Sequence, residues 1–339
     1  MSDSDFTVAL IDYDEDLFTP PGGEGEFLAK HGIKWVVGQN RTPETVLKAA
    51  KECDVAIVQS VRPLFTREVI EKLDRCRCLV RLGIGYDSID LTAATEKGIL
   101  VCNAPGFCTD DVAEHALALL MDAVRHTSRL DRNIREGGWD RTKARPVRRM
   151  KGCTMGFVAF GAIGRALAQR MKGFDMTLLA YDAYLDAKTI AEYGAEKVEL
   201  NELLRRSDFI SIHTPLTKET HHLIGKEQFG LMKDGAILVN TSRGPVVEEE
   251  ALVEALKGGK LWGVGLDVVE KEPLPLDSPL RQFDNVTFTP HVGSNSIEAV
   301  IDLYRKGCEI GVVVYEGRWP KSVVNPEVEG KTTHKYRKD

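Results

Sequence analysis

The segment from Met155 to Asp182 constrains the fold more than any other part of the 339-residue chain. An apolar run, Met155 to Phe160, leads into the turn Gly161-Ala-Ile-Gly164, and apolar residues then recur at three- and four-residue intervals. A second apolar run, Thr177 to Tyr181, ends on the acid Asp182. This order predicts a strand, a tight turn, a helix and a second, parallel strand.

The turn matches the dinucleotide fingerprint G-x-G-x-x-G, except that Ala159 stands at its first position. Backbone amides at the start of the helix would face a pyrophosphate, and the residues concerned are Gly161, Ala162, Ile163 and Gly164. Asp182 follows roughly 20 residues later, where an acid binds the ribose hydroxyls of NAD and repels the 2′-phosphate of NADP. The segment therefore predicts an NAD site; the alternative is a glycine turn in an unrelated strand-turn-helix unit.

Composition narrows the class of protein. The length suits two domains, and contents of 43% hydrophobic and 28% charged residues are ordinary for a globular protein. A net charge of −6 argues against nucleic acid as the main partner. No apolar run is long enough to span a bilayer, and the first residues lack the features of a signal peptide. We therefore expect a cytoplasmic protein with no membrane partner.

No metal site is expected from the cysteines and histidines. The seven cysteines include no Cys-x-x-Cys pair, so they are interpreted as reduced, mostly buried thiols. Four dispersed histidines lack a nearby cluster of acidic ligands and are interpreted as packing or surface residues: His115, His213, His221 and His222.

Short apolar runs alternate with helical patterns in two halves of the chain, which predicts an α/β protein with two parallel sheets. Strands are expected at 6–11, 33–37, 55–58, 79–82 and 99–102 in the first half, and near 155–160, 177–181, 208–213, 236–241, 263–268 and 286–290 in the second. The six later strands suit a dinucleotide-binding domain, whereas the first half has no glycine fingerprint.

Three helical patterns and one polar segment organise the chain around these strands. Thr42 and a following proline predict a helix over 43–53. A long amphipathic stretch, 110–136, is predicted to be one connector helix that packs against a partner subunit, with an ordinary core helix as the alternative. A further helix from about Ser294 would return the chain to the first domain, and the tail after Gly330 is expected to be disordered.

Polar residues follow the ends of late strands, where open α/β sheets place their ligand crevice. Arg243 offers a two-pronged donor for a carboxylate or a polarised carbonyl oxygen, with a surface salt bridge as the alternative. His291 can exchange a proton near neutral pH. Glu272, or else Asp267, is the candidate carboxylate beside it.

Several of these stretches together resemble the D-isomer-specific 2-hydroxyacid dehydrogenase family over nearly the whole chain. The strongest are 81–90, 102–106 with 112–115, the glycine turn, 213–217, 240–244, 266–268 with 272–273, and 289–291. The family includes glyoxylate and hydroxypyruvate reductases, phosphoglycerate dehydrogenases and corepressors. The resemblance implies a flavodoxin-like substrate domain (1–103 plus 296–339) and a Rossmann NAD domain (104–295), with a cleft between them and a homodimer formed by the long helix.

Residue roles carry over by motif. Arg243 would bind the substrate carboxylate and carbonyl, His291 would be the acid/base, and Glu272 would orient it. The loop Gly83, Ile84 and Gly85 would hold the substrate carboxylate. The remaining cofactor-binding candidates are His213, Thr214, Pro215, Thr241, Asp267 and Gly293. The expected reaction is NAD-dependent hydride transfer between a small 2-hydroxy acid and its 2-oxo acid.

The sequence leaves four questions open. Arg62 is either a pocket residue or a solvated loop charge. Trp139 either caps a partner's pocket or anchors an interface. The alternative to an enzyme is an NADH-sensing, corepressor-like interaction protein of the same fold, which keeps the same arginine, glutamate and histidine. Glyoxylate, hydroxypyruvate and sulfonated or phosphorylated acids all remain possible substrates.

Overall fold

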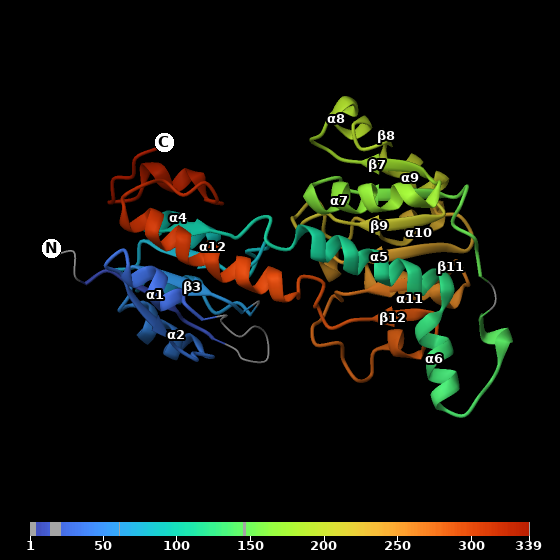
Figure 1. Cartoon of the computed structure of the whole chain (residues 1–339), viewed down its shortest axis with the longest axis horizontal. Helices are drawn as coiled ribbons and strands as arrows, with labels where there is room; N and C mark the ends of the chain where they lie inside the picture. Colours follow the sequence, from blue (N-terminus) through green and yellow to red (C-terminus); the bar gives the residue numbers. More distant parts are fainter. Residues whose placement is uncertain (1–4, 14–21, 61, 145–146, 339) are drawn as a thin grey trace. The chain divides into compact units, whose positions relative to one another are not determined.

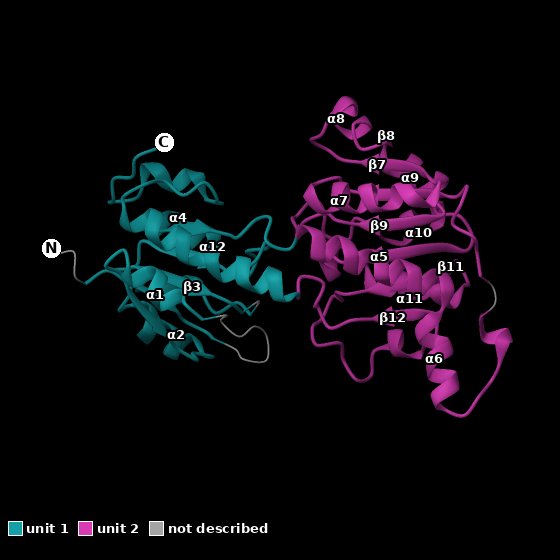
Figure 2. Ribbon diagram, in the orientation of Figure 1, with its two compact units in different colours: residues 1–108, 296–339 teal, residues 109–295 magenta. Residues whose placement is uncertain are grey.

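The chain folds into two compact α/β units, which are Met1–Cys108 with Ser296–Asp339, and Thr109–Asn295 (Figure 2). The computed structural model describes residues 5–13, 22–60, 62–144 and 147–338. Within these ranges no helix is both long and apolar enough to cross a membrane. The two parallel sheets with alternating helices confirm the predicted fold class.

The first unit contains a five-stranded parallel sheet in the order β2-β1-β3-β4-β5. Its strands are β1 (Thr7–Leu10), β2 (Lys34–Val37), β3 (Val55–Val58), β4 (Cys78–Arg81) and β5 (Leu100–Cys102). Its helices are α1 (Glu24–Ala29), α2 (Pro43–Ala50), α3 (Arg67–Ile70), α4 (Leu91–Lys97) and α12 (Ile297–Tyr315). This is the doubly wound order of flavodoxin-like domains, in which ligands bind at the carboxyl edge of the sheet.

Helix α2 begins at Pro43 as predicted but ends at Ala50, three residues before the predicted limit. Thr42 caps α2, with its side chain accepting from the amide of Thr45. Ser296 caps α12 in the same way, and α12 returns the chain to the first unit.

The prediction of a disordered tail after Gly330 is wrong. Residues 331–337 alternate between exposed and half-buried positions, and the amide of Trp319 donates to the carbonyl oxygen of Arg337 at 2.8 Å. The rings of Trp319 and Tyr336 pack edge to face. A polar composition hid an alternating pattern of Thr332, His334 and Tyr336 that buries one side of the tail.

The second unit contains a seven-stranded parallel sheet in the order β12-β11-β10-β9-β6-β7-β8. Its strands are β6 (Thr154–Val158), β7 (Thr177–Tyr181), β8 (Ala195–Lys197), β9 (Phe209–Ile212), β10 (Ala236–Asn240), β11 (Leu261–Leu266) and β12 (Val286–Phe288). Its helices are α5 (Thr109–Arg125), α6 (Thr127–Arg135), α7 (Ala162–Met171), α8 (Ala187–Ala191), α9 (Leu200–Arg206), α10 (Lys226–Leu231) and α11 (Glu249–Lys257). The strand order reverses between β6 and β9, which is where a Rossmann sheet binds its dinucleotide.

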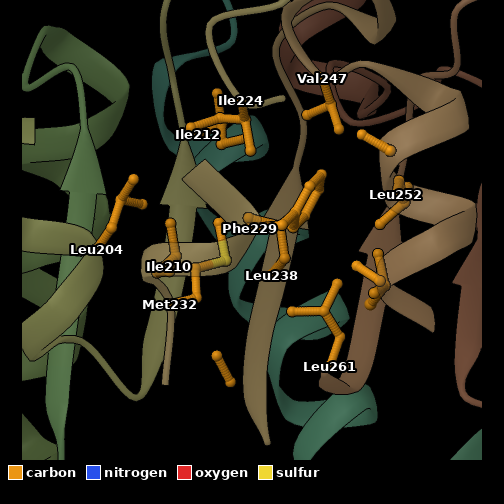
Figure 3. Close-up of a cluster of buried hydrophobic side chains, with 14 of the residues drawn as sticks. Leu204, Ile210, Ile212, Ile224, Phe229, Met232, Leu238, Val247, Leu252 and Leu261 are labelled. Atoms are coloured by element: carbon orange, nitrogen blue, oxygen red, sulfur yellow. The ribbon is translucent and has the colours of Figure 1, made fainter. Parts of the chain in front are cut away.

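Both faces of this sheet are buried, as expected for parallel strands. Successive residues point to opposite faces of the sheet. Phe209 and Ile237 therefore belong to a first apolar cluster on one face, and Ile210 and Leu238 belong to a second cluster on the other face. Figure 3 shows the second cluster, where Phe229 and Met232 of the α10 region pack beside Ile210 and Leu238. Helices α5 and α7 lie side by side over the first cluster (Figure 1).

Two expectations for this unit are corrected. Strand β8 was missed, because it has only three residues and a single buried one. The connector at 110–136 is two helices, α5 and α6, separated by His126 at φ 54°. His126 is buried, and its amide donates to the carbonyl oxygen of Asp122 at 2.6 Å. The left-handed residue separates α5 from α6. Helix α6 carries no buried residue.

Candidate active site

The glycine turn joins β6 to α7 and leaves space in front of the helix. Ala159 has φ 69°, a left-handed conformation that glycine adopts without strain. Gly161 precedes the first residue of α7, and a Cβ built on it would meet no atom within 4 Å. A Cβ on Gly164 would lie 2.9 Å from the carbonyl oxygen of Ala159. Gly164 thus serves packing within the turn, whereas Gly161 faces open space at a helix amino terminus.

Asp182 ends β7 beside this turn and is almost fully buried. Its carboxylate accepts from the amides of Phe160 at 2.8 Å, Tyr184 at 2.9 Å and Leu185 at 3.0 Å. Burial raises the pKa of Asp182, but these hydrogen bonds outweigh burial and hold the pKa below its ordinary value. A carboxylate has about four lone-pair sites, so about one remains for a ligand.

His213, Thr214 and Pro215 follow β9. The amide of His213 donates to the carbonyl oxygen of Val158 at 2.8 Å, and its ring stacks on Phe157. Its Nε2 is buried without a hydrogen-bond partner among the described residues. Burial lowers the pKa of His213 to about 4, so the imidazole is neutral at physiological pH.

Arg243 stands on the loop after β10. The side-chain amide of Asn240 donates to the carbonyl oxygen of Arg243 at 3.0 Å and fixes that backbone. A Cβ on Gly244 would lie 1.9 Å from the carbonyl oxygen of Val269, so glycine allows this loop to press against the loop after β11. The hydroxyl of Thr241 is buried and has no partner in the described part of the chain.

Asp267 directly follows β11, and its carboxylate holds the loop after β12 in place by hydrogen bonds. Its Oδ1 accepts from the hydroxyl of Thr289 at 2.6 Å and from the amide of Val292 at 2.9 Å, and its Oδ2 accepts from the amide of Gly293 at 2.9 Å. The Nε2 of His115 lies 3.3 Å from Oδ1. Burial raises the pKa of Asp267, but these contacts outweigh it and lower the pKa overall.

The loop that Asp267 holds contains His291, whose side chain contacts that of Glu272. The Nδ1 of His291 lies 2.8 Å from the Oε2 of Glu272, and each side chain is 31% exposed. The amide of Val269 donates to Oε1 of Glu272 at 3.3 Å. The structure therefore brings the predicted histidine and glutamate into direct contact. Asp267 contacts Thr289, His115 and the backbone of the loop rather than the imidazole of His291.

The predicted carboxylate loop belongs to the first unit. Gly83 has φ 149°, and its carbonyl oxygen accepts from the amide of Ala104 at 2.9 Å. The side chain of Asn103 donates to the carbonyl oxygen of Ile84 at 2.8 Å. This hydrogen bond helps to fix the Gly83 to Gly85 loop, while the side chain of Ile84 is exposed. Arg62 is exposed, and its amide donates to the hydroxyl of Ser60 at 2.9 Å.

The residues present fit NAD. Gly161 leaves open space at a helix amino terminus, Asp182 keeps a lone pair, and Thr241 offers a buried hydroxyl without a partner in the described chain. Among the described residues, no three His, Cys, Asp or Glu side chains gather so as to hold a metal ion.

Sequence reasoning missed two contacts at this edge of the sheet. The ring of His115 on α5 lies 2.8 Å from the hydroxyl of Thr289, and His222 lies 2.7 Å from Glu270. Both histidines were interpreted as packing or surface residues. Their spacing from their partners along the chain, 174 and 48 residues, leaves no local pattern that could have revealed the contacts.

A dinucleotide turn and a histidine–carboxylate pair at the same edge of one Rossmann sheet define the class as a dehydrogenase. The family model for the D-isomer specific 2-hydroxyacid dehydrogenase NAD binding domain matches residues 117–293. The chain therefore belongs to the D-isomer-specific 2-hydroxyacid dehydrogenases, which are NAD-dependent oxidoreductases acting on the CH–OH group of 2-hydroxy acids.

Sequence and structural similarity to individual proteins supports this family membership. A glyoxylate reductase of Korarchaeum cryptofilum is 42% identical over 289 residues, which cover 84% of this chain and 86% of the relative. A D-3-phosphoglycerate dehydrogenase of Methanocaldococcus jannaschii is also 42% identical, but the match spans 78% of this chain and only 50% of that longer protein. The crystal structure of a D-lactate dehydrogenase of Aquifex aeolicus, complexed with NAD and lactic acid, aligns with a TM-score of 0.80 at 28% identity, covering 96% of this chain and 98% of that one.

Proposed function

We propose that the chain reduces a short 2-oxo acid with NADH, and that glyoxylate is the first substrate to test. The observation that carries this proposal is the contact of 2.8 Å between His291 and Glu272. The 42% identity to a glyoxylate reductase supports the choice of substrate.

His291 is the proposed proton donor. Because Glu272 engages Nδ1, Nε2 is the nitrogen left to donate to the carbonyl oxygen of the substrate. NADH, when bound, supplies the hydride to the carbonyl carbon. Loss of the Nε2 proton leaves a neutral imidazole whose Nδ1–H still donates to Glu272, and the product is the 2-hydroxy acid.

Arg243 is proposed to bind the substrate carboxylate and to stabilise the charge that develops on the carbonyl oxygen. Its backbone is held by Asn240, and its Nη1 donates to the carbonyl oxygen of Ser242 at 2.7 Å. The backbone amides of the Gly83, Ile84 and Gly85 loop are proposed to bind the same carboxylate. The first unit is thus the proposed substrate domain, and the second is the NAD domain.

The cofactor residues are proposed as follows. Amides at the start of α7, from Gly161, Ala162, Ile163 and Gly164, bind the pyrophosphate, and Asp182 binds a ribose hydroxyl. Loop residues His213, Thr214, Pro215, Thr241 and Gly293 line the rest of the site. Only Oδ2 of Asp267 has capacity for the nicotinamide carboxamide, because Oδ1 already accepts several hydrogen bonds.

A homodimer and cytoplasmic residence complete the proposal. Trp139 is 81% exposed and α6 buries no residue, so this segment is the proposed contact with a second copy. All seven cysteines are free thiols, as is usual in a reducing compartment.

The test is NADH oxidation followed at 340 nm with glyoxylate, hydroxypyruvate, a phosphorylated acid and a sulfonated acid. We expect turnover of a short 2-oxo acid by the wild type, none by His291→Ala, and unchanged NADH binding by that variant. A preference for the phosphorylated acid that disappears in Arg62→Ala would assign Arg62 to the pocket. Turnover by His291→Ala near the wild-type rate would remove His291 from the mechanism, and peptide binding without turnover would favour an interaction protein.

A further inference from the structure

His222 joins three loops at the carboxyl edge of the second unit's sheet. It lies on the loop after β9, and its amide donates to the carbonyl oxygen of Pro245 on the Arg243 loop at 2.8 Å. Its Nε2 lies 2.7 Å from Oε1 of Glu270 on the Glu272 loop. One residue with φ 55° therefore contacts both loops that carry the proposed active-site side chains.

Glu270 is held from two directions. The same Oε1 that contacts His222 also accepts from the amide of Glu249, the first residue of α11, at 3.1 Å. A carboxylate at a helix amino terminus is favoured by the helix dipole. Burial, together with the charge of Glu270, raises the pKa of Glu249, so the two carboxyl groups share a crowded position.

The turn from Val269 to Glu272 connects Glu270 to the proposed acid/base pair, which is His291 with Glu272. The amide of Val269 donates to Oε1 of Glu272 at 3.3 Å, while Oε2 of Glu272 contacts His291. On its other side the turn presses against Gly244, where a Cβ would lie 2.5 Å from the amide nitrogen of Glu270. A shift of Glu270 would therefore move both Glu272 and the backbone next to Arg243.

We propose that His222 and Glu270 are positioning residues for the reaction, acting through Glu272 and Arg243. This inference rests on the proposed function. Neither side chain contacts His291, and the hydrogen bond forms with either charge state of the imidazole, because the neutral Nε2–H tautomer can also donate. We define the contact of His222 with Glu270 as the loop clasp.

Stability alone does not account for the loop clasp. The side chains of His222 and Glu270 are 37% and 32% exposed, and ion pairs with this exposure contribute little to folding. The contact instead helps to hold the Arg243 loop and the Glu272 loop in one arrangement relative to each other. Misplacement of reacting groups by about 1 Å can cost 100-fold in rate, so a weak contact can have a large effect on turnover.

The experiment compares variants that break the loop clasp with variants that keep it. His222→Ala and Glu270→Ala remove it, whereas Glu270→Gln keeps an oxygen that accepts from both His222 and the amide of Glu249. The matched control is His221→Ala, because His221 is an exposed neighbour whose ring lies 3.9 Å from that of His222 in a tilted arrangement. Unlike His222, it makes no side-chain hydrogen bond or ion pair to either active-site loop in the described part of the chain. Each variant is measured for kcat and KM with the best 2-oxo acid, for NADH affinity by fluorescence titration, and for Tm.

We expect His222→Ala and Glu270→Ala to lower kcat by roughly 10- to 100-fold. The Kd for NADH should change less than about twofold, and Tm should fall by no more than about 4 °C. Glu270→Gln and His221→Ala should retain kcat within about threefold of wild type. A purely structural role would lower Tm and NADH affinity along with kcat, and Gln would not rescue the rate selectively.

Two results would overturn the inference. One is a kcat within about twofold of wild type in both clasp-breaking variants, and the other is a loss in His221→Ala equal to theirs. Failure of the proposed function looks different, because the wild type itself would then reduce no 2-oxo acid. A wild type that turns over, with an inactive His291→Ala and normal clasp variants, would refute only the inference.

Discussion

Gly161→Ala tests the cofactor site with little disturbance of the fold. A Cβ at this position meets no atom within 4 Å, and the backbone φ of −66° is ordinary for alanine. The added methyl therefore enters only the space proposed for the pyrophosphate. Alanine is a poorer helix cap than glycine, so we expect a loss of about 0.5 kcal/mol and a Tm lower by about 1–2 °C.

The effect on binding should be much larger. Displacing the pyrophosphate from the start of α7 would break at least one charge-assisted hydrogen bond, which is worth about 1.5–3 kcal/mol. Each 1.4 kcal/mol is a factor of ten, so the Kd for NADH should rise about 10- to 150-fold. Fluorescence titration of NADH measures this directly, and differential scanning calorimetry measures the Tm.

Two other glycines serve as controls. A Cβ on Gly173, in the same unit, also meets no atom within 4 Å, so Gly173→Ala should leave NADH affinity unchanged. Gly164→Ala places its methyl 2.9 Å from a backbone oxygen and should lower Tm more than Gly161→Ala does. An unchanged Kd for NADH in Gly161→Ala would refute the assignment of the pyrophosphate to this turn.

The remaining predictions concern the turn, its acid and a buried histidine. Ala159→Gly should raise stability by about 0.5–1 kcal/mol in urea unfolding, because it removes left-handed strain at φ 69°, and a loss of stability would contradict that reading. Asp182→Ala should lower both the preference for NAD over NADP and the Tm, since it leaves three amides without their acceptor; an unchanged cofactor ratio of kcat/KM would count against the ribose contact. The folded-state pKa of His213 is depressed from 6.5 to about 4, so its contribution to stability is complete above pH 6.5 and is lost as the pH falls toward 4. Between pH 6.5 and 4, the free energy of unfolding in urea should fall for the wild type by up to about 1.4 kcal/mol per pH unit more than for His213→Phe. Parallel pH curves for the two proteins would refute the depressed pKa of His213.

The sequence predicted the sheets well, because parallel strands buried on both faces appear as uninterrupted apolar runs. Strand β7 was predicted at its observed limits, and β10 ends one residue before its predicted limit. Strand β8 was missed because Ala195–Lys197 is too short and too exposed to form such a run. The break at His126 was missed because an apolar stripe reports which face is buried and carries no information on backbone φ.

The candidate site was predicted as a set of strand-end residues, and its internal contacts required the structure. Motif position indicated Glu272 and His291, but only the fold shows that their side chains meet. Asp267 was expected to bind the cofactor or to stand beside His291, and most of its hydrogen bonds go to the loop that carries His291. The loop clasp depends on His222 and Glu270, whose partners are set by three loop geometries that leave no local sequence pattern.

The hydrogen bonds of Asp182 have a consequence for redesigning the coenzyme preference. The acid proposed to read the ribose also closes the turn at Phe160 and the loop at Tyr184 and Leu185. Replacing it with a small or basic residue to admit a 2′-phosphate would remove the acceptor on which the surrounding backbone depends. A switch toward NADP would therefore need a substitute acceptor for these amides introduced in the same step, and selection on coenzyme preference alone would first pass through a destabilised protein.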